Sequence, residues 1–132
     1  MPYSVKPHTA DIRLKLSGKS FAVLLEQSVM GLMKILAGKV SPTKVIRRVE
    51  VSATDKTCLL VDFLNEVLAL AETNREQYSN VEIIELTDHK TTAKLTGTKV
   101  HNFTQDVKAV TYHEAEVIED DGMWKVNLVL DV

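Results

Sequence analysis

The sequence is poor in cysteine, the residue that cross-links small disulfide-rich and zinc-binding proteins. It contains a single cysteine, Cys58, among 132 residues, which excludes an internal disulfide and a zinc site built from several thiolates. A lone thiol is typical of the reducing cytosol. The chain also has no apolar run near the ~18 residues that a membrane-spanning helix needs. Residues 1–5 lack the basic start and apolar stretch of a signal peptide. We therefore expect a cytoplasmic protein that does not act at a membrane.

A basic excess is missing as well. Lys and Arg number 16 against 18 Asp and Glu, which gives a formal net charge of −2. Proteins that bind nucleic acid tightly through its phosphates usually carry a basic excess, so the balance leaves room only for a local basic patch. The four histidines form no HExxH pattern, and neither GxGxxG nor a P-loop occurs. No nucleophile elbow surrounds any serine. These absences disfavour a zinc hydrolase and a nucleotide-binding enzyme of the common classes.

The composition that is present is that of a globular protein. Hydrophobic residues make up 45% of the chain and charged residues 26%, and at this length a chain buries roughly two thirds of its unfolded surface. No internal repeat or linker rich in Pro, Gly or Ser interrupts it. We expect one domain over residues 1–132.

Hydrophobic periodicity predicts the elements. Apolar and polar residues alternate over 11–17 and 45–53, which is typical of half-buried strands. Helical spacing predicts one helix over 20–37, with Ser20 as its N-cap and Gly38 at its C-terminal end, and a second from the turn at 55–57 to about residue 75. Two hairpins follow: 81–86 with 91–100, and 107–118 with 123–132 through Asp120-Asp121-Gly122. This order predicts an α+β fold, a mostly antiparallel sheet with two helices packed on one face.

Two aspartates could meet at the strand ends. Asp11 begins the first strand and Asp131 ends the last, each on the face opposite the apolar residues. The terminal carboxylate of Val132 would be a third acidic group. Converging carboxylates repel each other unless a cation or a proton compensates them, and oxygen ligands favour a hard cation such as Ca²⁺, Mg²⁺ or Mn²⁺. The alternative is that Asp11 caps a turn and Asp131 is a solvated terminal residue.

Three further side chains could carry chemistry. Lys108 lies in a β-rich stretch, where it could hold a phosphate or a partner's carboxylate, or could simply protect an edge strand from aggregation. His113 on the same stretch is more typical of a surface histidine than of a ligand. Cys58 falls in the first turn of the second helix, where a thiol pKa can be lowered, but its neighbours Leu59 and Leu60 favour simple burial.

Four blocks of this sequence resemble the archease family, and the resemblance spans essentially the whole chain. The family usually ends in Asp-Ile, whereas this chain ends in Asp131-Val132, a change that keeps the main-chain carboxylate. The blocks are His8-Thr9-Ala10-Asp11-Ile12; Leu59-Leu60 with Phe63-Leu64-Asn65-Glu66; Lys108-Ala109-Val110-Thr111-Tyr112-His113; and Trp124 with Leu130-Asp131-Val132.

The resemblance implies a function that composition does not show. Archeases are non-catalytic proteins that activate an RtcB-type tRNA-splicing RNA ligase, promoting its guanylylation and its multiple turnover in tRNA splicing and RNA repair. The family's divalent metal site falls on Asp11, Asp131 and Val132, with Ca²⁺ expected and Mg²⁺ or Mn²⁺ as alternatives. The family's important lysine falls on Lys108, and we add His8 as a contact to the partner or the nucleotide. The partner is the ligase, and tRNA is reached through it.

Two other functions compete with this one. A chaperone or RNA-associated adaptor without a dedicated ligase role would depend on exposed apolar patches and little on the two aspartates. A small metal-dependent enzyme would need a substrate pocket beside Asp11 and a general base, for which His8 is the convenient candidate.

Overall fold

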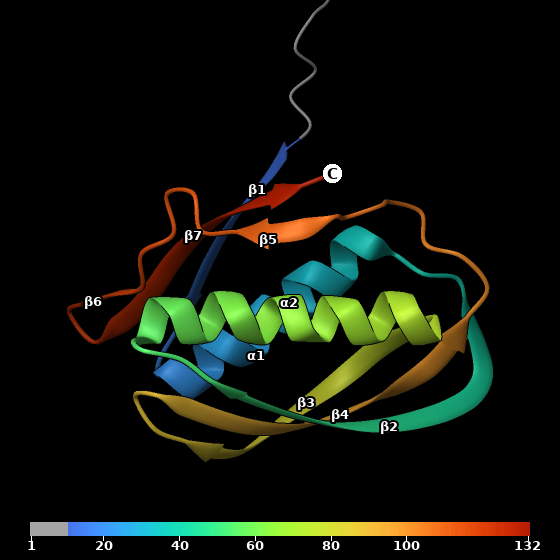
Figure 1. Ribbon diagram of the computed structural model, residues 1–132, viewed down its shortest axis with the longest axis horizontal. Coiled ribbons are helices and arrows are strands. Elements are labelled where there is room, and N and C mark those ends of the chain that lie inside the picture. Colours follow the sequence, from blue (N-terminus) through green and yellow to red (C-terminus); the bar gives the residue numbers. More distant parts are fainter. Residues whose placement is uncertain (1–10) are drawn as a thin grey trace, which may run out of the picture.

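The computed structural model describes residues 11–132. These residues form seven strands and two helices, which are labelled in Figure 1. In chain order they are β1 (Asp11–Gly18), α1 (Phe21–Leu36), β2 (Val40–Ser52), α2 (Lys56–Asn74), β3 (Glu76–Leu86), β4 (Lys90–Val100), β5 (Ala109–Thr111), β6 (Ile118–Asp120) and β7 (Met123–Asp131).

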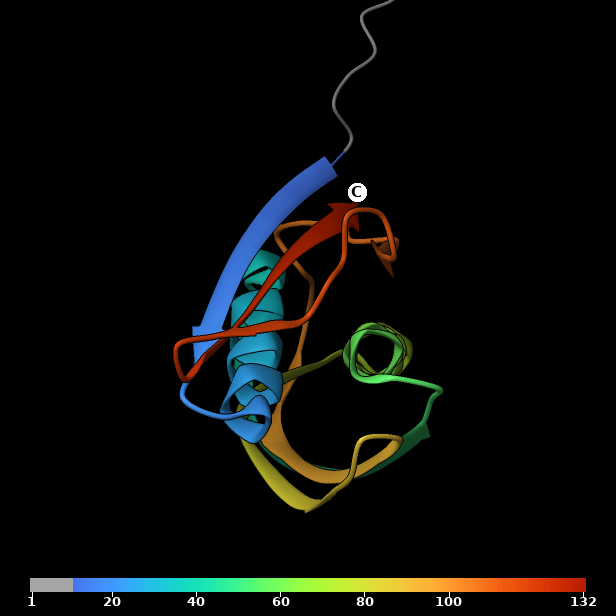
Figure 2. The same cartoon turned by 90° about the vertical axis from the view of Figure 1, so that its left-hand side faces the viewer.

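The strands form two antiparallel sheets with the helices between them. In the first sheet β7 is central: it pairs with β1 on one side and, on its other side, with β5 near one end and β6 near the other. The second sheet has the order β2-β4-β3. Figures 1 and 2 show the two sheets as outer layers, with α1 between them and α2 beside α1. The predicted α+β class is confirmed, and each sheet has helices on one face only; the strands divide between two sheets because two apolar helices need cover on both sides.

Both helices begin at the residues that the sequence predicts. The Ser20 hydroxyl accepts a hydrogen bond from the Val23 N–H at 3.1 Å, and the Asp55 carboxylate accepts one from the Cys58 N–H at 2.8 Å. Each side chain thus gives a partner to a first-turn N–H group that has none within the helix. The apolar stripes of α1 and α2 supply most of the buried core, completed by inward residues of both sheets. Burial of these stripes, rather than intrinsic helix propensity, holds the two helices in place.

Three boundaries differ from the prediction. The left-handed C-cap of α1 is Ala37 (φ 45°), one residue before Gly38; a Cβ on Gly38 would lie 2.8 Å from a Val100 methyl group, which is why glycine stands there. Strand β2 begins at Val40, earlier than the alternation predicts, because the register shifts between Val40 and Lys44 and breaks the pattern. Strand β3 begins directly after α2 at Glu76, a charged residue on the buried face.

The stretch 107–118 is mostly not a strand, contrary to the prediction. Only Ala109–Thr111 pairs with β7 before the chain turns away, with the Ala115 N–H bonded to the Tyr112 carbonyl and Glu114 at φ 59°. It returns to β7 as β6, and the predicted turn follows, with Asp121 and Gly122 both at positive φ. Between these two short strands, residues 112–117 do not pair with β7. We call this segment the detour, and it shapes the outer face of the first sheet.

No helix within residues 11–132 combines the length and the apolar character that crossing a membrane requires.

Candidate functional site

The β1–β7 register places the two predicted aspartates directly opposite each other. Asp11 and Asp131 are partners in this antiparallel pair, and on its other side Asp131 is the partner of Ala109 in β5. The Lys108 N–H donates to the Asp131 carbonyl at 2.7 Å. Three chain segments therefore meet at one corner of the first sheet. We call Asp11, Lys108, Asp131 and Val132 the carboxylate corner.

The carboxylate corner is acidic and open to solvent. Side chains directly opposite on paired strands have Cβ atoms about 4.5–5.5 Å apart, and like charges there destabilise the pair. Asp131 is exposed and makes no ion pair within 4.0 Å with any residue from 11 to 132. Asp11 has one partial partner: its carboxylate lies 3.8 Å from a guanidinium nitrogen of Arg13. The repulsion between the two aspartates is thus only partly compensated within the chain.

Arg13 is itself shared with a second acid. Its guanidinium also pairs with Glu114, on the detour after β5. The hydrogen bond and the charge of Glu114 raise the pKa of Arg13, with a smaller contribution from Asp11, and Arg13 in turn lowers the pKa of Glu114. Because its stronger contact is to Glu114, Arg13 leaves the carboxylate corner short of positive charge.

The oxygen donors of the corner fit a hard cation. Within residues 11–132 no three His, Cys, Asp or Glu side chains lie close enough together to hold a metal ion. Asp11 and Asp131 could therefore supply only two side-chain ligands. The remaining ligands would be a main-chain carboxylate, water or groups of a partner. Ca²⁺ takes six to eight oxygen ligands at 2.3–2.6 Å, a distance that two carboxylates on facing strand positions can span. Such a site would be weak and partly hydrated.

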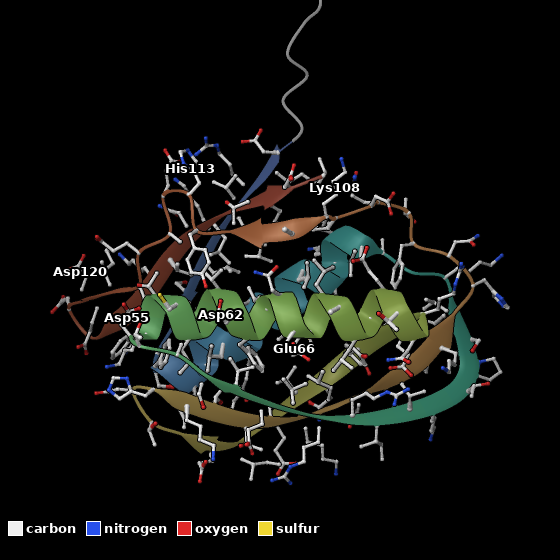
Figure 3. The ribbon with its side chains drawn as sticks, in the orientation of Figure 1. Asp55, Asp62, Glu66, Lys108, His113 and Asp120 are labelled. Atoms are coloured by element: carbon white, nitrogen blue, oxygen red, sulfur yellow. The ribbon has the colours of Figure 1, made fainter. Side chains whose placement is uncertain are left out.

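Lys108 brings the opposite charge to the same corner. Its side chain is exposed, and it makes no ion pair with any described residue. Figure 3 shows Lys108 near the C-terminal end of the chain, with His113 at the far end of the same segment. An exposed ammonium group without an ion pair among the described residues can meet a phosphate or a partner's acidic group without displacing an internal contact.

Asn65 positions this segment, a role that the sequence reasoning did not assign. Its amide donates to the Val110 carbonyl at 2.8 Å and accepts from the Val110 N–H at 2.8 Å. The side chain thus replaces a neighbouring strand on the free edge of β5, two residues from Lys108. The sequence signal was an asparagine at the edge of the apolar stripe of α2, where a polar residue needs a reason.

Tyr112 gives a second tie between the same two elements. Its hydroxyl bonds to the Asp62 carboxylate on α2, and this contact, followed by burial, raises the pKa of Tyr112 to about 12. The phenol therefore stays protonated near neutral pH and remains a donor. Together Asn65 and Asp62 fix the segment that carries Lys108 to the helix.

The remaining candidates lie apart from the corner or outside the description. His113 is exposed and lies 4.0 Å from Glu114, beyond the far end of β5. Asp55 raises the pKa of the Cys58 thiol, mainly through their hydrogen bond, which argues against a thiolate nucleophile. His8, predicted to contact the partner or the nucleotide, lies outside the described residues.

Comparison with known proteins gives a consistent result over almost the whole chain. Residues 3–132 match the family described as the Archease protein family (MTH1598/TM1083). The chain is 33% identical to Protein archease of Pyrococcus abyssi, over 95% of this chain and 94% of that one. Protein archease of Thermococcus kodakarensis gives the same identity and the same coverage.

Two solved structures share the fold. One is the crystal structure of an archease described as a possible chaperone, from Thermotoga maritima, with a TM-score of 0.75, 22% identity and 98% of both chains covered. The other is the solution structure of protein 1598 of Methanobacterium thermoautotrophicum, with a TM-score of 0.73, 26% identity, and 98% of this chain and 96% of that one covered. Both support the arrangement of two sheets around two helices.

Proposed function

The chain belongs to the archease family, and from this membership we propose that it is a non-catalytic activator of an RtcB-type tRNA-splicing RNA ligase. In this role it promotes guanylylation of the ligase and allows each ligase molecule to complete many rounds of joining. The observation that supports it most is the carboxylate corner, in which the strand register sets Asp11 opposite Asp131 with Lys108 bonded to the same residue. A weak, exposed charged site of this kind suits a surface that another protein completes.

We propose that Asp11, Asp131 and the main-chain carboxylate of Val132 hold a divalent cation, with Ca²⁺ expected and Mg²⁺ or Mn²⁺ as alternatives. When bound, such a cation supplies charge compensation and positions oxygen ligands. The two aspartates present fixed oxygens at the mouth of the ligase site, where positioning and electrostatics dominate phosphoryl transfer. Lys108 meets a nucleotide phosphate or an acidic side chain of the ligase from the other side of Asp131.

The shape of the surface favours an activator over a small metal-dependent enzyme. An enzyme would place its metal in a hollow that encloses the substrate. A hollow of about 280 Å³ next to the corner is lined by residues such as Arg13, Glu114 and Asn127, but neither Asp11 nor Asp131 contributes to its lining. Among residues 11–132, the two carboxylates therefore lie outside this hollow.

The test is RNA joining by a matched RtcB-type ligase at limiting enzyme, with and without this protein. The protein is expected to convert about one round of joining per ligase into many rounds. Asp11→Asn and Lys108→Ala should remove most of this stimulation, whereas Asp121→Asn, the same change of charge in the exposed turn between β6 and β7, should keep it. Unchanged turnover with the matched ligase, or full stimulation by Asp11→Asn at every metal concentration, would contradict the proposal.

The ligand role of Val132 has a separate test. Two residues appended after Val132 move the terminal carboxylate away while leaving every side chain in place. We expect this variant to bind Ca²⁺ more weakly in calorimetry and to stimulate the ligase less. Equal calcium affinity in the extended and original chains would remove Val132 from the ligand set.

A chaperone or RNA-associated adaptor is the second candidate, and one observation favours it. The outer face of the second sheet carries two exposed apolar side chains, Ile46 at 64% and Ile84 at 49% exposure. An adaptor that grips partners through this face would lose activity on Ile46→Asn and not on Asp11→Asn. The ligase proposal predicts the reverse order, so the same turnover assay separates the two.

A further inference from the structure

A second hollow lies on the outer face of the first sheet, farther along β1 and β7 from the carboxylate corner. It has a volume of about 340 Å³. Its floor follows the strand register, in which Lys15 is opposite Asn127 and Ser17 is opposite Lys125. One wall comes from the detour between β5 and β6. The outward side chains that line it are Lys15, Ser17, Glu116, Ile118, Lys125 and Asn127.

Hydrogen-bond donors outnumber acidic groups in this hollow. The two lysines, the serine hydroxyl and the asparagine amide can all donate, and Glu116 is the one carboxylate among the lining residues. Lys15 makes no ion pair within 4.0 Å with any residue of the described range. Lys125 has one partner, Asp120, at 3.7 Å, and both side chains are about half exposed or more, so this ion pair is weak.

The spacing of the two lysines suits a phosphate group. Lys15 and Lys125 are diagonal neighbours on paired strands, and residues at such positions lie about 7–8 Å apart. Two flexible ammonium groups can converge on one anion from that separation, while in its absence the like charges repel across the floor. Ser17 and Asn127 occupy the other diagonal and can donate to the same oxygens.

The hollow also continues toward the carboxylate corner. Lys15 and Asn127 line both this hollow of about 340 Å³ and the neighbouring hollow of about 280 Å³. The neighbouring hollow extends to Arg13, two residues from Asp11. Arg13 is already engaged by Glu114, so the positive charge available to a ligand lies on Lys15, which has no ion pair among the described residues, and on the weakly paired Lys125. A chain of phosphates bound at these lysines would run along β1 toward the corner.

We propose that Lys15, Lys125, Ser17 and Asn127 form a phosphate-binding site for single-stranded RNA, which this protein holds beside the site of ligation. The choice of RNA rests on the proposed function; the phosphate chemistry rests on the hollow alone. A free nucleotide is the other source of the same chemistry. An acidic peptide of the partner is a different occupant; the hydroxyl and amide donors beside the lysines favour the many acceptor oxygens of phosphates over it.

The test uses the full chain, labelled with ¹⁵N, and no ligase. It is titrated separately with a short single-stranded RNA, with GTP and with a poly-glutamate peptide of matched charge. We expect RNA to shift the backbone amides of Lys15, Ser17, Lys125 and Asn127. Lys15→Ala and Lys125→Ala should each weaken RNA binding and reduce the slope of log K against log salt by about one. Lys44→Ala, which removes another exposed edge-strand lysine on the second sheet, should change neither quantity.

Each outcome decides the proposal. Shifts at these residues with RNA that Lys15→Ala removes support it. Shifts with GTP alone, shifts with the peptide alone, equal losses in Lys15→Ala and Lys44→Ala, or no shift with any probe would overturn it. Because the ligase is absent, such a failure says nothing against ligase activation. RNA binding combined with unchanged turnover would contradict the proposed function instead.

Discussion

Glu76 and the Asp11–Asp131 pair carry the same kind of charge on opposite sheets, but the protein treats them in opposite ways. The Glu76 side chain is 0% exposed and has a full set of partners. They are Nε and Nη2 of Arg47 at 2.9 and 2.7 Å, the Tyr78 hydroxyl at 2.7 Å, and Lys99 at 3.4 Å. All of these come from the β2-β4-β3 sheet that surrounds it.

The pair at the carboxylate corner has almost none of this support. Asp11 and Asp131 face each other, and Arg13 lies 3.8 Å from one of them while bonding more closely to Glu114. A buried charge without partners would cost several kcal/mol of unfolding free energy. A carboxylate inside the fold therefore needs hydrogen-bond donors and positive charges from its own chain. Exposed carboxylates tolerate an incomplete set of partners, which leaves them free to bind a cation or another protein.

The largest expected effect is on stability and comes from Glu76→Ala. Removing this carboxylate leaves Arg47 and the Tyr78 hydroxyl without their shared acceptor, and breaking a buried ion pair costs about 3 kcal/mol of unfolding free energy. Urea denaturation measures it. Below its unfolding transition the variant should stimulate the ligase as the original chain does. A loss below about 1 kcal/mol would show that Glu76 is not as tightly coupled as its contacts indicate.

The next effect is at Asn65, which supports the corner from inside. Asn65→Leu deprives both backbone groups of the buried Val110 of partners, at about 1 kcal/mol for each lost bond, or about 2 kcal/mol in total. Hydrogen exchange of the Val110 amide should accelerate. Asn65→Asp keeps the acceptor but not the donor and should fall between the two chains. Equal exchange rates in all three would argue against the positioning role.

A smaller effect is the acid dependence of the Glu76 cluster. Burial alone would raise the pKa of Glu76, but the hydrogen bonds and charge of Arg47, with help from Tyr78 and Lys99, lower it overall. A lowered folded-state pKa means that this stabilisation is present above the ordinary value of 4.5 and is lost as pH falls through the folded-state pKa. Unfolding free energies measured from pH 7 downward should fall less steeply in Glu76→Gln, which has no such proton to gain. Parallel curves would contradict this.

The smallest effect, and the one of opposite sign, is at the corner itself. In metal-free buffer Asp131→Asn removes a like-charge pair and should raise the unfolding free energy by about 0.5 kcal/mol. Added Ca²⁺ should stabilise the original chain, because a ligand that binds the folded state raises its stability, and should do so less in the variant. Thermal unfolding with and without Ca²⁺ measures both. If calcium stabilised the two chains equally, Asp131 would not be a ligand.

The local pattern of apolar and polar residues was sufficient to predict the two helices and the two strands, β1 and β7, that form the carboxylate corner. Ser20 caps the first helix as the sequence predicts, and the second helix begins within the predicted turn at 55–57. The alternations that start at Asp11 and end at Asp131 continue in β1 and β7. Pattern was insufficient where a charged residue is buried. Glu76 begins β3 on its buried face, and no local rule predicts that, because its partner Arg47 lies on another strand.

The sequence by itself determined the α+β class, the faces of β1 and β7, and the presence of two aspartates off the apolar face, because side-chain alternation depends only on neighbouring residues. Only the tertiary structure decided that Asp11 lies opposite Asp131, that the Lys108 N–H bonds to Asp131, and that Lys15 and Lys125 share one hollow. Register between distant strands is set by how their apolar faces meet the helices, and this information is spread over the whole core.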